Sequence, residues 1–222
     1  MALLEESQAD GAAHIAARIA AGRCVGQPFR HWLLDEVLPS RLAEGVGALP
    51  VWSPAIGDTL GRRETHNSTR VFVSPGNQAR FPVCAALART FQHLAVLSQI
   101  EAAYGVDLGG SYLRIEYCQD HDGFWLEPHT DITVKRLTML VYLSVGPEAA
   151  DWGTDVYDSD LERVGRAPGG FNCGLVFVPG ADTWHGFHPR PIRGVRRSLI
   201  VNYVSPEWRA RHELAFPDRP VP

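Results

Sequence analysis

The sequence predicts an α+β fold, with helices in the N-terminal half and antiparallel strands in the C-terminal half. Residues 12–21 are rich in alanine, and residues 81–104 carry apolar side chains at helical spacing. From residue 109 onward, short runs of β-branched and aromatic residues alternate with turn residues, a pattern typical of an antiparallel sandwich or barrel. We therefore expect the helices to support sheets that close round a site.

The composition is that of an ordinary globular chain that forms one domain. Of its 222 residues, 45% are hydrophobic and 21% are charged, so the chain can bury a full core. We expect a helical part over about residues 1–108, a strand-rich core over about residues 109–204 and a tail over residues 205–222. The tail contains four prolines and is either a wrapping arm or a disordered end.

Charge and cysteine usage exclude several classes of protein. The net charge of −4 gives no broad basic field, so we expect no nucleic-acid partner. Residues 1–10 lack the features of a signal peptide, and no apolar run is long enough for a membrane span, so we expect a cytoplasmic protein without a membrane partner. The four cysteines form no Cys-x-x-Cys pair and are expected to be free thiols. Nothing in the pattern indicates an oligomeric state.

The N-terminal elements follow from apolar spacing and from proline. The elements expected after the first helix are a second helix over residues 29–42, a loop-rich region to about residue 67, a strand over residues 69–74 and the long helix over residues 81–104. Pro39 ends or kinks the second helix. Pro82 suits the first turn of the long helix.

The C-terminal half is predicted to be a series of short strands. They are expected at residues 111–118, 123–129, 137–144, 153–158, 174–179 and 197–204. Residues 119–123 are predicted to form a hairpin loop that joins the first two of these strands, with Gly123 free to take a positive φ.

A candidate metal site lies near the end of the second of these strands. His129 and Asp131 are two residues apart, and residues at i and i+2 of an extended strand project from one face. A third ligand has to come from elsewhere in the chain, and His185 follows the strand and Pro-Gly turn at residues 174–180. Two histidines and one carboxylate form the facial triad of non-heme Fe(II) oxygenases. His188 is the alternative third ligand.

The C-terminal half resembles the Fe(II)/2-oxoglutarate-dependent dioxygenases, in particular the prolyl-hydroxylase-like branch. The matching elements, in order, are Tyr117, residues 129–131, 137–144 and 153–155, the stretch from 177 to His185, and residues 196–198. The resemblance implies a double-stranded β-helix, or jelly roll, with Fe(II) held by His129, Asp131 and His185. It also implies 2-oxoglutarate and O₂ as cosubstrates, with ascorbate as an optional addition.

In this family an arginine deeper in the barrel receives the distal carboxylate of 2-oxoglutarate. Arg196 is our choice, because a guanidinium offers a fixed planar fork to a carboxylate. The family's Arg-x-Ser pairing selects the strand face of Arg196 and Ser198, whereas a shift of one residue would select Arg197. Ser198 would add a hydroxyl to the same carboxylate, and Tyr117 is a candidate for a further contact.

The resemblance implies hydroxylation of an unactivated C–H bond, with release of succinate and CO₂. The presence of Asp131 favours hydroxylation over halogenation and leaves desaturation, epoxidation and ring closure open. Residues that could line the mouth of the site are Asn67, Arg70, Arg114, Glu116, Trp125, Glu127, Lys135 and Trp184. These side chains indicate a small polar substrate, such as an amino acid or a biosynthetic intermediate. The alternatives are a protein or peptide side chain, a cupin-like metal enzyme that does not use 2-oxoglutarate, and a noncatalytic binding module.

Overall fold

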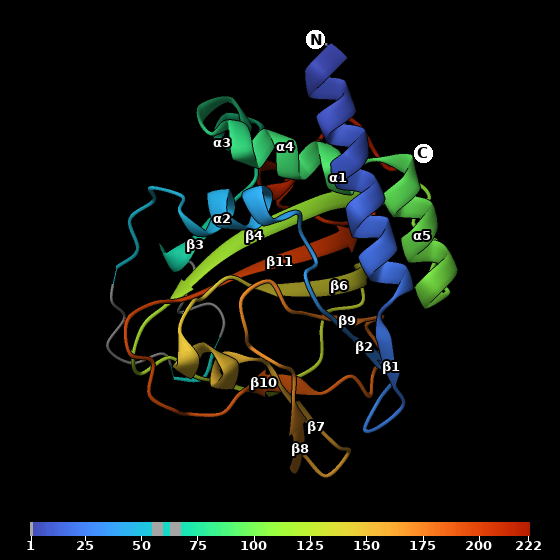
Figure 1. The fold of residues 1–222 in the computed structure, drawn as a ribbon. Coiled ribbons are helices and arrows are strands. Elements are labelled where there is room, and N and C mark those ends of the chain that lie inside the picture. Colours follow the sequence, from blue (N-terminus) through green and yellow to red (C-terminus); the bar gives the residue numbers. More distant parts are fainter. Residues whose placement is uncertain (1, 55–59, 63–67) are drawn as a thin grey trace.

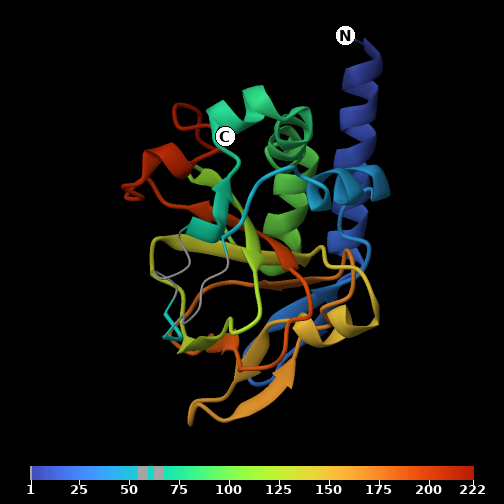
Figure 2. The ribbon, with the colours of Figure 1, turned by 90° about the vertical axis from the view of Figure 1, so that its left-hand side faces the viewer.

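The structure is a computed structural model that describes residues 2–54, 60–62 and 68–222. Two antiparallel sheets face one another, and the long helices cover the outer face of the larger sheet (Figures 1 and 2). The strand order is β1-β2-β9-β6-β11-β4-β3 in the larger, seven-stranded sheet and β5-β10-β7-β8 in the smaller, four-stranded sheet. The α+β prediction is therefore confirmed.

The bounds of the elements are as follows. The helices are α1 (Ala2–Ala20), α2 (Ser40–Gly47), α3 (Pro75–Arg80), α4 (Pro82–Phe91) and α5 (Leu94–Tyr104), with short 3₁₀ turns at Pro147–Trp152 (η2) and Arg211–Glu213 (η3). The strands of the larger sheet are β1 (Arg23–Val25), β2 (His31–Leu34), β3 (Arg70–Phe72), β4 (Tyr112–Asp120), β6 (Lys135–Tyr142), β9 (Gly174–Phe177) and β11 (Arg196–Val204). The smaller sheet contains β5 (Leu126–His129), β7 (Asp155–Tyr157), β8 (Arg163–Arg166) and β10 (His185–Phe187).

The predicted helices at residues 12–21 and 81–104 are present, but the second is divided. It forms α4 and α5, and Pro82 lies in the first turn of α4 as expected. At the break, His93 has an extended backbone and caps α5: its Nδ1 accepts a hydrogen bond from the backbone N–H of Ala95 at 3.2 Å. Gly105 ends α5 in the left-handed conformation with φ of 68°.

The predicted helix at residues 29–42 is wrong. His31–Leu34 forms strand β2, which pairs with β1 on one side and β9 on the other. A short apolar run fits either a buried strand or a helix, and pairing with β9, far away in the chain, decided the outcome here. Pro39 immediately precedes α2 instead of ending a helix.

The predicted hairpin between the first two C-terminal strands is also wrong. Strand β4 continues to Asp120 and pairs with β3 and β11 in the larger sheet, whereas β5 pairs with β10 in the smaller sheet. The connection therefore crosses from one sheet to the other. Gly123 has a φ of 86°, as predicted.

The remaining predicted strands are present as β3, β6, β7, β9 and β11, whereas β1, β8 and β10 were not predicted. The tail packs against the larger sheet as a wrapping arm. Ala215 and Val221 donate backbone hydrogen bonds to Leu113 and Ser111, and Leu214 is fully buried.

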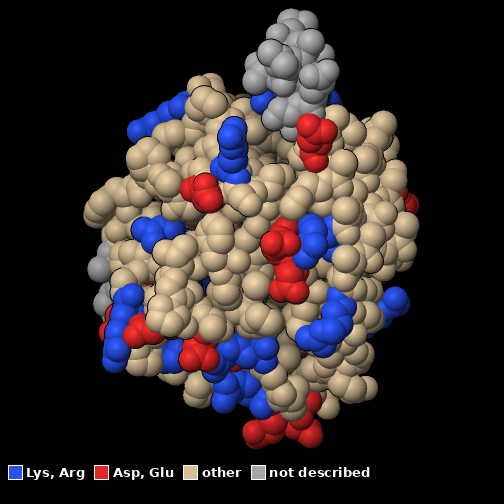
Figure 3. All heavy atoms as spheres, viewed as in Figure 1, with Lys and Arg blue, Asp and Glu red and all other residues tan. Residues whose placement is uncertain are grey.

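The main hydrophobic core lies between the larger sheet and the helices. Leu113, Ile115, Leu199 and Val201 from β4 and β11 pack there with side chains of α1, α4 and α5. On the face of the molecule drawn in Figure 3, basic and acidic side chains are interspersed. No helix in the described ranges combines the length and the apolar character that a bilayer crossing requires.

Candidate active site

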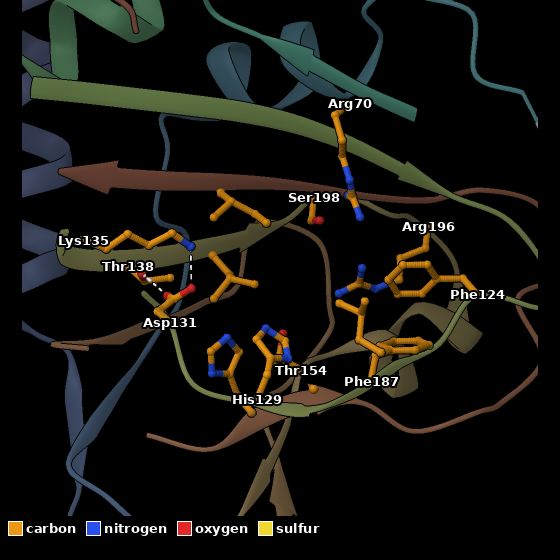
Figure 4. Close-up of a pocket in the computed structure, with 15 residues that line it drawn as sticks. Arg70, Phe124, His129, Asp131, Lys135, Thr138, Thr154, Phe187, Arg196 and Ser198 are labelled. Carbon is orange, nitrogen blue, oxygen red and sulfur yellow. Dashed lines mark hydrogen bonds and ion pairs between the residues drawn. The ribbon is translucent and has the colours of Figure 1, made fainter. Parts of the chain in front are cut away.

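A cavity lies between the two sheets and receives side chains from both (Figure 4). One end is lined by histidine, aspartate and lysine, the other by two arginines and a serine, and apolar side chains lie between them. The lining residues are Arg70, Phe124, Leu126, His129, Asp131, Lys135, Thr138, Leu140, Thr154, His185, Gly186, Phe187, Arg196, Ser198 and Ile200.

Two histidines face one another at the first end of the cavity. His129 is the last residue of β5 and His185 the first of β10, and the two are directly opposite in the antiparallel pair. Their ring centroids are 4.4 Å apart. The Nδ1 of His129 lies 2.9 Å from the Glu127 carbonyl oxygen, and the Nδ1 of His185 lies 2.9 Å from that of Thr183.

These hydrogen bonds fix the state of both rings. A carbonyl accepts only from an N–H, so each Nδ1 carries a hydrogen and each Nε2 is the ring nitrogen left to face a ligand. Burial lowers the pKa of His185 to about 4, with the neighbouring His129 adding to the effect. His185 is therefore neutral at pH 7. A metal-binding histidine also usually donates its other ring N–H to a backbone carbonyl.

Asp131 follows β5 in the loop that leads to β6. Its Oδ1 is paired with the Lys135 ammonium, and its Oδ2 accepts the Thr138 hydroxyl hydrogen at 2.6 Å (Figure 4). Burial alone would raise the pKa of Asp131, but the Lys135 charge, His185 and the two hydrogen bonds hold it well below the ordinary value. Asp131 is thus an anion beside the two imidazoles.

Thr138 links Asp131 to the larger sheet. Its Oγ1 accepts a hydrogen bond from Asn202 Nδ2 at 2.9 Å, and the Oδ1 of Asn202 in turn accepts one from Arg114 Nη1 at 3.3 Å. Because the Thr138 oxygen is held as an acceptor on one side, its hydroxyl hydrogen is directed to Asp131.

The donor set fits Fe(II) in kind: two imidazole nitrogens and one ionised carboxylate. In the described ranges, however, no three His, Cys, Asp or Glu side chains are already gathered as a metal-binding group. The carboxylate of Asp131 is turned toward Lys135 and Thr138 instead. A carboxylate has about four lone-pair sites, so bonds to both neighbours leave capacity for a further ligand.

The second end of the cavity contains Arg196 and Ser198. These residues lie on the cavity face of β11 together with Ile200, whereas Arg197 is absent from the lining and its N–H is bonded to Ser144. Arg196 donates from Nε to the Trp152 carbonyl at 2.7 Å and from Nη1 to Asp120 at 2.5 Å. Its guanidinium also lies 4.6 Å from the centre of the Phe187 ring.

Arg196 ends a row of buried charges of alternating sign, which we name the charge ladder. Its members are, in order of contact, Glu213, Arg114, Glu116, Arg70, Asp120 and Arg196. The successive N–O distances are 2.6, 2.6, 3.6, 3.3 and 2.5 Å. All members except Glu213 have side chains no more than 6% exposed. Alternation of sign lets several charges remain buried side by side.

Tyr117 does not reach the cavity. It lies on the opposite face of β4, packs in the main core and donates a hydrogen bond to the Gly47 carbonyl at 3.4 Å. The expected contact between Tyr117 and a cosubstrate is therefore wrong, because strand alternation turns this side chain toward the helices.

The other predicted site residues are divided between the cavity and its surroundings. Arg70 and Lys135 line the cavity, and Glu127 lines a second hollow that borders His129 and Asp131 from outside. Arg114 and Glu116 belong to the charge ladder, Trp125 packs on Gly61, and Trp184 is half-buried outside both hollows. His188 is exposed and does not line the cavity. Asn67 lies outside the described residues.

Sequence reasoning missed Thr138, Thr154, Asp120 and the two phenylalanines Phe124 and Phe187. A signal for Thr138 was present, because alternation in the predicted strand 137–144 places Thr138, Leu140 and Tyr142 on one face. For Asp120 the error was the predicted hairpin, which assigned this residue to a loop.

No protein-family model matches the chain, and no curated protein matches it. Solved structures do. A prolyl-4-hydroxylase of Pseudomonas putida matches with a TM-score of 0.52 at 17% identity, over 86% of this chain and 94% of that one. A prolyl hydroxylase of Trichoplax adhaerens, solved with a hypoxia inducible factor peptide fragment, matches with a TM-score of 0.55 at 13% identity, over 92% and 93%. The non-heme α-ketoglutarate-dependent epimerase SnoN of nogalamycin biosynthesis gives 0.52 at 16% identity, over 87% and 83%.

Proposed function

We propose that this chain, which has the fold of prolyl hydroxylases and of a 2-oxoglutarate-dependent epimerase, is itself a non-heme Fe(II)- and 2-oxoglutarate-dependent oxygenase with a jelly-roll core. The observation that carries the proposal is the pair of histidines on β5 and β10. Both imidazoles are oriented by backbone carbonyls to offer Nε2, and an ionised carboxylate lies beside them. His129, Asp131 and His185 would hold the metal.

When bound, Fe(II) supplies, with 2-oxoglutarate and O₂, the oxidising power to hydroxylate an unactivated C–H bond with release of succinate and CO₂. The chain's own residues bind and orient. Lys135 and Thr138 keep Asp131 ionised and fix its position. The arginines at the other end receive a carboxylate of the cosubstrate with charge-assisted hydrogen bonds. Leu126, Leu140 and Phe187 exclude water between the two ends.

The substrate we propose is a small polar molecule that enters through the second hollow. That hollow borders His129, Asp131 and Lys135 and combines the apolar side chains of Leu126 and Ile132 with the opposite charges of Glu127 and Arg62. Side chains of opposite charge in one hollow suit a zwitterion such as an amino acid. SnoN, a structural neighbour, is an epimerase from nogalamycin biosynthesis.

A peptide or protein side chain is the second candidate substrate. The observation that favours it is the neighbour from Trichoplax adhaerens, which was solved with a peptide fragment bound. Succinate formation from 2-oxoglutarate, measured with free amino acids in one series and proline-containing peptides in another, separates the two candidates. Stimulation by peptides alone would overturn the small-molecule proposal.

The experiment that tests the proposed function is an anaerobic titration of the metal-free protein with Fe(II) and then 2-oxoglutarate. The expected result is a visible metal-to-ligand charge-transfer band from the chelated 2-oxo acid. His129→Ala should lose the band, and the matched control His188→Ala should keep it, because His188 lies outside the cavity.

Other outcomes identify the competing functions. Iron binding without a band would favour a cupin-like enzyme that does not use 2-oxoglutarate. Absence of both metal binding and O₂ consumption would favour a noncatalytic binding module. If His188→Ala loses the band and His185→Ala keeps it, His188 and not His185 is the third metal ligand.

A further inference from the structure

Arg70 comes from strand β3, far from β11 in the sequence, yet it enters the same end of the cavity as Arg196. In Figure 4 its guanidinium extends from β3 toward Ser198 and Arg196. The side chain is only 5% exposed. The cavity end is therefore built by two arginines from strands far apart in the chain, β3 and β11.

The two arginines differ in how their N–H groups are used. Arg196 makes two hydrogen bonds to protein oxygens, those of Trp152 and Asp120. Arg70 lies 3.6 Å from Glu116 and 3.3 Å from Asp120, but in the described part of the chain its Nε–H has no acceptor and Oδ1 of Asp120 accepts no hydrogen bond. Its other polar neighbour is the Cys118 thiol, a weak acceptor.

A buried guanidinium with an unused N–H calls for an acceptor, because leaving a buried charged donor unsatisfied is costly. Asp120 is shared between the two arginines and keeps the like charges together. A carboxylate placed beside Ser198 would lie against the guanidinium of Arg70, which extends there in Figure 4, and the planar fork of arginine fits a carboxylate with two bonds.

We propose that Arg70 is the principal donor to the distal carboxylate of the 2-oxo acid, with Arg196 held beside it by Asp120 and Trp152 as a second, flanking cation. This inference rests on the proposed function. The sequence predicted that an arginine of β11 binds the distal carboxylate, whereas this inference gives that role mainly to an arginine of β3. Strand β3, at the edge of the larger sheet, then forms part of the cosubstrate site.

The test compares 2-oxoglutarate with 2-oxobutyrate, which has the same 2-oxo acid head and lacks the distal carboxylate. Both are titrated anaerobically into Fe(II)-loaded protein, with dissociation constants from calorimetry and from the charge-transfer band. The wild type should prefer 2-oxoglutarate. Arg70→Gln should weaken 2-oxoglutarate binding by about 10- to 100-fold and leave 2-oxobutyrate binding unchanged, because the distal carboxylate is the part of the 2-oxo acid that Arg70 would bind.

Three further variants complete the test. Arg70→Lys should retain part of the preference, because a lysine keeps the charge without the fork. Arg196→Gln should reduce the preference less than Arg70→Gln. Arg197→Gln is the matched control on the opposite face of β11 and should behave as the wild type. Melting temperatures and Fe(II) affinity, measured on every variant, identify any that fail to fold.

Retention of the full preference in Arg70→Gln, or a larger loss in Arg196→Gln, would overturn the inference and return the role to β11. Different results would overturn the proposed function. If the wild type shows no band but binds 2-oxoglutarate calorimetrically and loses this binding in Arg70→Gln, the iron chemistry is wrong and the Arg70 site stands. If the wild type binds no 2-oxoglutarate with or without metal, both are overturned.

Discussion

The two faces of strands β4 and β11 are equally buried and chemically opposite. The helix-facing residues are Leu113, Ile115, Tyr117, Leu199, Val201 and Tyr203, and none is more than 1% exposed. The residues on the opposite face, which includes the cavity wall, include Arg114, Glu116, Asp120, Arg196, Ser198 and Asn202, and none is more than 5% exposed. Along much of the two strands, apolar side chains on the helix face thus alternate with charged or polar side chains on the other face; Cys118 and Ile200 on the cavity side and Gln119 and Arg197 on the helix side depart from this pattern.

The difference separates stability from function. Apolar burial on the helix side contributes about 25 cal/mol per Å² to folding. Buried ion pairs are weak evidence for stability, because desolvation offsets much of their attraction. We therefore expect side chains on the cavity face to contribute mainly to ligand binding, and side chains on the helix face to contribute mainly to the stability of the fold. Substitutions on the two faces test this division.

The largest effect should follow from His185→Ala or Asp131→Ala. Either variant should abolish succinate formation from 2-oxoglutarate, because a ligand of the proposed metal is lost. For His185→Ala, the free energy of unfolding of the metal-free protein should fall by about 1–3 kcal/mol, because the ring is buried and its Nδ1–H is bonded to the Thr183 carbonyl. Turnover and urea denaturation measure the two quantities. Full activity in either variant would exclude the ligand assignment.

Glu116→Ala should break the charge ladder. Two arginines, Arg70 and Arg114, would lose an anion in a buried setting, and removing one partner of a buried pair costs about 3–5 kcal/mol. The matched control is Glu148→Ala, which breaks the exposed pair with Arg193 and should cost about 0–1 kcal/mol. Equal effects of the two variants in urea denaturation would show that the ladder is not a structural unit.

Leu199→Ala should act on the helix face alone. The side chain is fully buried in the main core, so truncation should cost about 2–5 kcal/mol of unfolding free energy. 2-Oxoglutarate affinity should be unchanged below the melting temperature. Val164→Ala, in an exposed position on β8, is the control for the change to alanine. A loss of cosubstrate affinity in Leu199→Ala without loss of stability would contradict the division of roles.

The smallest change in unfolding free energy is expected when two buried tyrosines of the core are replaced by phenylalanine. Tyr203 donates its hydroxyl hydrogen to the Phe91 carbonyl at 2.6 Å, so Tyr203→Phe should cost about 1 kcal/mol. The Tyr104 hydroxyl is buried without a hydrogen-bond partner in the described part of the chain, so Tyr104→Phe should be neutral or stabilising. Thermal denaturation of both variants measures the contrast, and a destabilised Tyr104→Phe would point to a bound water.

Local pattern was sufficient for much of the fold. Alanine-rich and amphipathic spacing predicted α1 and the region of α4 and α5. Alternation predicted β3, and short β-branched and aromatic runs between turn residues predicted β4, β5, β6, β7, β9 and β11. It failed at residues 29–42, where an apolar run fits both a helix and a buried strand, and at residues 119–123, where turn residues suggested a hairpin. In both places strand pairing with a distant segment was decisive.

The sequence by itself determined the residue types of the site: a His-x-Asp triplet, a later histidine and an Arg-x-Ser pair on one strand face. The tertiary structure alone decided that His129 and His185 stand directly opposite, that Tyr117 faces the helices and that Arg70 joins Arg196. The physical reason is that alternation along a strand is local, whereas neighbours across strands depend on pairing register between segments far apart in the chain.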